Sequence, residues 1–117
     1  MFPYENWSVY KKALELREIA QKLSKTKTRG LGSDLSQLRR SSSSIVLNIA
    51  EGAGHTQPGK KLESYRTALA SAYESGGTCK ILEQHVYERE LAARGRVVSD
   101  EIAAQMIGLI KSVENRQ

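Results

Sequence analysis

The sequence predicts an all-α protein, an up-down-up-down four-helix bundle, from three observations. Apolar residues recur at steps of three and four along four long segments, which places them on one face of a helix. Alanine, leucine, glutamate, lysine and arginine dominate, and all are good helix formers. Proline is scarce, with two residues, and no strand-like alternation appears. At 117 residues, we expect one domain over residues 1–117.

The first helix is expected to run from about Glu5 to Ser24. Trp7, Tyr10 and Leu14 widen its apolar face, and Trp7 is interpreted as a core or interface anchor. The stripe that should face the core consists of Val9, Ala13, Leu16, Ala20 and Leu23.

A basic loop follows this helix. Between residues 22 and 40 the only acid is Asp34. The basic residues of this stretch are Lys22, Lys25, Lys27, Arg29, Arg39 and Arg40. Such a stretch favours electrostatic binding of RNA or DNA, which needs charge but no particular geometry. The alternative is a solvated loop, because no aromatic residue is interleaved to stack on bases.

The second helix is expected to begin after Gly32, where Ser33 or Asp34 would cap it, and to end near Gly52. Its core face would carry Leu35, Leu38, Ser42, Ile45 and Ile49. The four serines at 41–44 are poor helix formers, and we interpret them as small residues that let a neighbouring helix approach closely. The alternative, a phosphorylated or catalytic serine, has no supporting base nearby in the sequence.

Four polar residues of the second helix are candidates for a structural network: Arg39, Arg40, Asn48 and Glu51. Because a buried charge is costly unless it is paired, we expect Glu51 to pair with Arg39 or Arg40, or to accept hydrogen bonds from backbone N–H groups. The network is expected to reach Glu74 on the third helix. The alternative is that these residues form a functional site.

The loop after the second helix fits the spacing of a phosphate-binding loop, G-x-x-x-x-G-K, from Gly54 to Lys60. The next residue would have to be Ser or Thr to hold magnesium, and it is Lys61. A helix also precedes the loop where a strand is required. We therefore reject nucleotide binding, and we count Lys60 and Lys61 among the candidate nucleic-acid-binding residues instead.

The third helix is expected to be the longest, from about Pro58 to Ala93. The pair at 76–77, two glycines, should either kink it or permit a close helix crossing. Gly95 would close it as a C-cap. The fourth helix would then begin at Ser99 as an N-cap and fray over residues 115–117.

No enzyme, cofactor or metal site is expected. A di-iron bundle needs two Glu-x-x-His repeats, and neither His55 nor His85 follows a glutamate by three residues. Zinc is not expected, with one cysteine and no paired histidines. Ser99 and Asp100 are interpreted as a helix cap rather than as part of a catalytic triad.

Charge and cysteine content bear on the cellular location of the protein. The net charge of +5 is moderately basic. The single cysteine, Cys79, cannot form an internal disulfide and is interpreted as a small core residue, so a reduced cytoplasmic location is expected. No export signal is recognised, and no apolar run approaches the roughly 18 residues of a membrane span.

Part of the second helix resembles a known signature. Residues 37–40 (QLRR), Ile45, residues 48–52 (NIAEG) and Gly54 are similar to the "QLRR…SI..NIAEG.G" signature of the bacterial four-helix bundle family encoded in intervening sequences of 23S ribosomal RNA genes. The resemblance extends along nearly the whole chain and includes Trp7 and the region of Ala72 and Glu74. The chain departs from the signature in the serines at 41–44 and in His55, which stands at a commonly basic position.

The resemblance implies a basic accessory bundle that works with RNA or with a nucleic-acid-processing protein. The family is located in ribosomal RNA genes and is similar to the accessory variability proteins of diversity-generating retroelements, which work with a reverse transcriptase. It also implies a homopentamer. The alternative is a structural or protein-interaction bundle with no nucleic-acid role.

The residues themselves also support self-association, without giving a subunit number. Surplus apolar residues lie around the first and third predicted helices: Trp7, Tyr10, Leu14, Tyr65, Tyr73, Ile81 and Tyr87. A helix in a small bundle has one inner seam, so further apolar surface favours burial against another subunit.

Overall fold

The computed structural model describes residues 1–26 and 30–116. The described residues contain no strand, which confirms the all-α prediction. A short 3₁₀ helix precedes four α-helices: η1 (Pro3–Asn6), α1 (Ser8–Ser24), α2 (Gly32–Gly54), α3 (Pro58–His85) and α4 (Arg89–Asn115).

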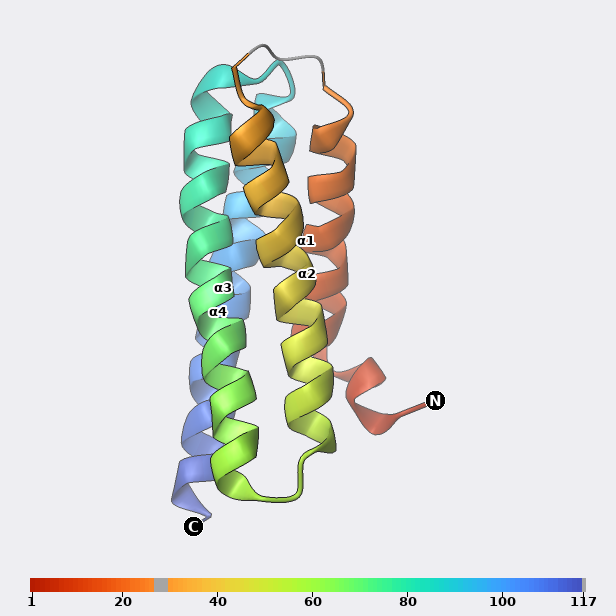
Figure 1. The fold of residues 1–117 in the computed structure, drawn as a ribbon, viewed down its shortest axis with the longest axis vertical. Helices are drawn as coiled ribbons and strands as arrows, with labels where there is room; N and C mark the ends of the chain where they lie inside the picture. Colours follow the sequence, from red (N-terminus) through yellow and green to blue (C-terminus); the bar gives the residue numbers. More distant parts are fainter. Residues whose placement is uncertain (27–29, 117) are drawn as a thin grey trace.

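The four helices stand side by side and alternate in direction (Figure 1). Each helix packs on the next along the chain, and α1 closes the bundle against α4. We call the end where α1 and α3 finish and α2 and α4 begin the loop end. The α2–α3 turn and the C-terminus lie at the opposite end (Figure 1). This arrangement is the predicted up-down-up-down bundle.

The core consists of the apolar stripes of all four helices. The stripe predicted for the first helix is buried along its whole length, and Trp7 packs half-buried against the core. The largest fully buried side chains are Tyr65, Leu16, Leu23, Leu38, Ile45, Ile49, Leu82, Ile102 and Met106. Periodicity therefore identified the core faces of the first two helices correctly, whereas Tyr65, expected among the surplus surface residues, belongs to the core.

The largest correction concerns the boundary between the third and fourth helices. The helix expected to reach Ala93 ends at His85, and α4 begins at Arg89. Val86 takes an extended conformation and is buried, which turns the chain back into the core before the predicted stop. Ser99 is therefore not an N-cap; it lies inside α4 and its hydroxyl donates to the carbonyl of Gly95 at 2.8 Å.

Two glycines mark close approaches of α4 to its neighbours. A Cβ atom at Gly95 would lie 2.8 Å from the Cys79 Sγ, so this glycine is a packing residue and not the predicted C-cap. A Cβ at Gly76 would lie 3.4 Å from the Cβ of Ser99, and α3 continues through Gly76 without a break. Gly76 thus lies at a helix crossing, whereas nothing lies within 4 Å of a Cβ at Gly77, which faces away from α4. Burial raises the pKa of the Cys79 thiol to about 12.

The remaining helix ends shift by small amounts. α1 begins at Ser8, because residues 3–6 form the 3₁₀ turn η1. α2 begins at Gly32 with Leu31 as its N-cap residue, so neither Ser33 nor Asp34 caps it. Its last residue is Gly54, two residues beyond the expected end.

Candidate nucleic-acid interface

The predicted basic residues do not form one surface. Lys22 and Lys25 lie at the loop end, whereas Lys60 and Lys61 lie in the first turn of α3 at the other end. A helix the length of α2, 23 residues, separates the two groups by about 35 Å. Two further members of the predicted set, Lys27 and Arg29, lie outside the described residues.

Lys61 caps the C-terminal end of α2 at the α2–α3 turn. Its ammonium group donates to the carbonyl of Gly52 at 2.6 Å and to that of Ala53 at 3.3 Å. The same nitrogen lies 5.6 Å from the centre of the Tyr65 ring. Burial, and then the charge of Arg116, lower the pKa of Lys61. Lys61 therefore satisfies the last carbonyls of α2, which have no partner within the helix.

A groove runs along the outward face of α2 and holds most of the predicted polar residues. We call it the α2 groove; its volume is about 630 Å³. It is lined by Gln21 of α1 and by Ser36, Arg39, Arg40, Ser43, Ser44, Leu47, Asn48 and Glu51 of α2. The structure thus brings four of the five network candidates to one surface, where solvent reaches them.

The predicted pairing of Glu51 with an arginine is wrong. Arg40 and Glu51 are eleven residues apart on one helix, which separates their backbones by about 16 Å. The Glu51 carboxylate is exposed and lies 3.6 Å from the Nε2 atom of His55, one turn away. Asn48 donates to the carbonyl of Ser44 at 2.9 Å rather than to either charge.

Glu74 is connected to α2 through a residue that the predicted network left out. The Gln37 amide donates to the Glu74 carboxylate, and the Gln37 oxygen accepts from the Arg40 guanidinium at 3.3 Å. Gln37, Arg40 and Glu74 also line a smaller pocket between α2 and α3. The expected link between the two helices therefore exists, but on the surface and with Gln37 at its centre.

Arg39 and Arg40 differ from the arginines that bridge helices. Arg66, Arg94 and Arg96 each lie 2.9 Å from a glutamate on another helix: Glu114, Glu15 and Glu83 respectively. Arg39 and Arg40 are exposed, and no carboxylate of the described part of the chain lies within ion-pair distance of them. Their charges are therefore open to a partner from outside the chain.

The serine block determines which way these arginines point. Ser41 lies 2.7 Å from Ser75, hydroxyl to hydroxyl, and Ser71 donates to Ser44 at 2.9 Å. These small pairs hold α2 close against α3. With Ser41 and Ser44 directed toward α3, the neighbouring Arg39 and Arg40 are left on the exposed side of α2.

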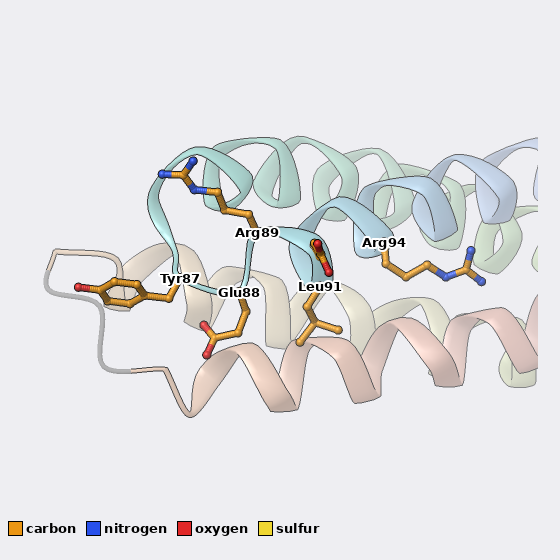
Figure 2. Close-up of a pocket in the computed structure, with 6 residues that line it drawn as sticks. Tyr87, Glu88, Arg89, Leu91 and Arg94 are labelled. Atoms are coloured by element: carbon orange, nitrogen blue, oxygen red, sulfur yellow. The ribbon is translucent and has the colours of Figure 1, made fainter.

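The loop end carries an exposed aromatic residue, Tyr87. Tyr87 was expected within the third helix, but it lies in the turn between α3 and α4 and is 91% exposed. It lines a hollow with Glu88, Arg89, Leu91 and Arg94 (Figure 2). A correct helix boundary would have placed this tyrosine on the loop end, near Lys22 and Lys25.

Residues 1–26 and 30–116 hold no group of three or more His, Cys, Asp or Glu side chains arranged to bind a metal ion. Over the same residues, no helix combines the length and the apolar character that crossing a membrane requires.

Comparison with known proteins identifies one family. The family model described as "23S rRNA-intervening sequence protein" matches residues 5–113, a stretch that includes α1, α2, α3 and most of α4. No curated protein matches the chain.

Proposed function

The chain belongs to the 23S rRNA-intervening sequence protein family, and from this premise we propose that it is a small basic accessory protein that binds RNA without catalysing a reaction. One observation carries the proposal: Arg39 and Arg40 both line the α2 groove, and no carboxylate of the described residues lies within ion-pair distance of either. In this role the protein would bind RNA on its own or present it to a nucleic-acid-processing partner.

The chemistry of the groove suits a sugar–phosphate backbone. The planar guanidinium group of arginine binds a phosphate through two parallel hydrogen bonds. Gln21, Ser36 and Ser43 line the same part of the groove and offer donors and acceptors for ribose hydroxyls. Glu51 lies at the far end and would repel phosphate, so the backbone is expected to follow the half of the groove nearest the loop end.

Salt dependence tests the proposal directly. Each phosphate contact releases a counterion, so log K falls with log salt by about 0.7 per contact on single-stranded RNA. Arg39→Gln combined with Arg40→Gln should therefore reduce the slope by about 1.4. The measurement is fluorescence anisotropy of labelled oligocytidylate titrated with protein at several salt concentrations.

A matched variant separates local contact from net charge. Lys11→Gln combined with Lys111→Gln removes two charges from exposed positions outside the α2 groove, at residues that likewise make no salt bridge within the described residues. It should retain the slope of the unmodified protein to within a few tenths. Equal slopes for the two double variants would show that the groove is not the site, and a protein that binds no RNA would refute the function itself.

We also propose that the chain forms a homo-oligomer. Leu47 is 66% exposed, Tyr73 60% and Ile81 46%, and such apolar surface favours burial against another copy. A subunit number of five rests on the family resemblance alone. Sedimentation equilibrium tests both points: a mass near 13.0 kDa would refute association, and a dimer or tetramer mass would refute the pentamer.

The second candidate function, a protein-interaction bundle with no nucleic-acid role, is favoured by one surface. Tyr73, Gly77 and Ile81 follow one another at steps of four along the exposed side of α3. Because glycine adds no side chain, a partner helix could approach closely between the two larger residues. Association without any RNA binding in the two experiments above would favour this function over the first.

A further inference from the structure

The turn between α3 and α4 displays an aromatic ring in solvent. Val86, just before the ring, is 2% exposed, and its N–H donates to the carbonyl of Leu82 at 3.0 Å. Leu91, four residues after it, packs against the core. The backbone on both sides is thus anchored, while Tyr87 itself is 91% exposed. An anchored turn that holds an aromatic side chain in solvent is suited to contact with a ligand.

The space beside the ring has walls of mixed chemistry. We call it the Tyr87 hollow; its volume is about 640 Å³, and Tyr87, Glu88, Arg89, Glu90, Leu91 and Arg94 line it (Figure 2). Arg94 donates two hydrogen bonds to Glu15, at 2.9 and 3.3 Å, so its charge is already paired. Arg89 is exposed, and no salt bridge to it is found among residues 1–26 and 30–116.

The two carboxylates decide which part of a nucleotide fits. Glu88 and Glu90 would repel a phosphate placed inside the hollow. They can instead accept hydrogen bonds from the N–H groups on the edge of a base, as carboxylates do from the amino group of cytosine. A tyrosine ring adds a stacking surface that every base can use. The hollow therefore favours a base with an exocyclic amino group, with its phosphate outside near Arg89.

We propose that the Tyr87 hollow receives an unpaired base of a bound single-stranded RNA. This inference rests on the proposed function and narrows its ligand from RNA in general to RNA with unpaired bases. A base within a duplex is stacked and paired, so it cannot enter the hollow without being extruded.

The hollow and the α2 groove are near enough to share one strand. The groove includes Gln21 of α1, and α1 ends a turn later, at the loop end that also carries the α3–α4 turn (Figure 1). Lys22 and Lys25 lie in and just after this last turn of α1. Across the helices the molecule measures only 25 Å and 20 Å, so a short strand can run from the arginines over the end of α1 to Tyr87.

The test compares tyrosine variants in binding to labelled oligocytidylate. Stacking of one base on an aromatic ring corresponds to about a 5- to 150-fold difference in affinity, so Tyr87→Ala should weaken binding by that range. Tyr87→Phe keeps the ring and should bind like the unmodified protein. Phe2→Ala is the matched control, because Phe2 is also an exposed aromatic residue, 65% accessible, but lies just before η1, away from the hollow.

Two further readouts separate this proposal from the one on which it rests. Tyr87→Ala should leave the salt slope unchanged, because stacking releases no counterion, whereas the Arg39 and Arg40 double variant should lower it. Tyr87→Ala should also leave binding to a short RNA duplex unchanged. Unmodified affinity of Tyr87→Ala for oligocytidylate, or an equal loss on the duplex, would overturn the stacking site while the arginine groove stands. A protein that binds neither RNA would overturn both.

Discussion

The α2–α3 seam and the α1–α4 seam hold the same bundle together in different ways. Between α2 and α3 the contacts are short and made by small residues, such as the Ser41–Ser75 hydroxyl pair at 2.7 Å. Between α1 and α4 long charged side chains reach across, as in Lys12 to Glu101 at 3.1 Å. The α2–α3 seam is determined by the small side chains that pack inside it, and the α1–α4 seam by the ion pairs that bridge its edge.

The difference matters for the candidate interface. In the α2–α3 seam, any rotation of α2 about its axis would drive a larger side chain into α3, so the direction in which Arg39 and Arg40 point is determined by sterics. The ion pair across the α1–α4 seam is partly exposed instead, with the side chains of Lys12 and Glu101 23% and 41% exposed, so it constrains α1 less than close steric contact would. We infer that α2 and α3 form the rigid platform of the site and that α1 is the more adjustable wall.

Gly52→Ala should produce the largest loss of stability. A Cβ atom there would lie 2.4 Å from the ring of Tyr65, which is 1% exposed and cannot move aside. Overpacking of this kind outweighs the roughly 1 kcal/mol that alanine gains over glycine in a helix, so we expect a net loss of about 2–3 kcal/mol in unfolding free energy. Urea denaturation followed by circular dichroism measures it.

Gly54→Ala is the control for this prediction, because nothing lies within 4 Å of a Cβ at Gly54. Its unfolding free energy should stay within about 0.5 kcal/mol of the original. Equal effects of the two substitutions would mean that the α2–α3 seam can open to accept a larger side chain. The claim that sterics determine this seam would then be wrong.

Removing one hydroxyl from the seam should have the next largest effect. Ser41→Ala leaves the hydroxyl of Ser75, a residue with no exposed surface, without its partner, and an unsatisfied buried group costs about 1–3 kcal/mol. The double variant Ser41→Ala with Ser75→Ala should be less destabilised than the two single variants added together. Strict additivity in this double-mutant cycle would show that the two hydroxyls do not interact.

The sequence predicted the faces of the helices better than their ends. The stripe from Val9 to Leu23 was correct because burial follows a period of 3.6 whatever the neighbours are. The boundary at Gly95 was wrong because a glycine at a helix end and a glycine at a helix crossing look alike in a sequence. Only the position of Cys79 on the neighbouring helix distinguishes them.

The sequence identified several residues of the candidate site but not how they are arranged. Arg39, Arg40 and Asn48 were identified as related, and they do share a groove. Helix geometry alone could have excluded the pairing with Glu51, since eleven residues correspond to three turns. The Tyr87 hollow could not be found, because it depends on where α3 ends, and that is decided by burial of Val86 against other helices.

The smallest expected effect lies in the α1–α4 seam. Arg94→Gln breaks a bidentate pair with Glu15 whose side chains are 50% and 39% exposed. Exposed ion pairs contribute at most about 1 kcal/mol, because water screens the charges and the long side chains lose freedom when they are held. We therefore expect Arg94→Gln to lower the unfolding free energy by less than Ser41→Ala does, and this difference should disappear near 1 M salt, where the screening length falls to about 3 Å.

Lys11→Gln provides the comparison within the same region. Lys11 is exposed on α1, and no salt bridge to it is found in the described part of the chain, so its removal changes the net charge equally without breaking a pair. The excess loss of Arg94→Gln over Lys11→Gln then measures the bridge itself. If that excess approached the loss caused by Gly52→Ala, or persisted in high salt, the bridges would hold α1 as firmly as sterics hold α2. The wall of the groove formed by Gln21 would then be as rigid as the platform, and no adjustment of α1 to a bound strand would be expected.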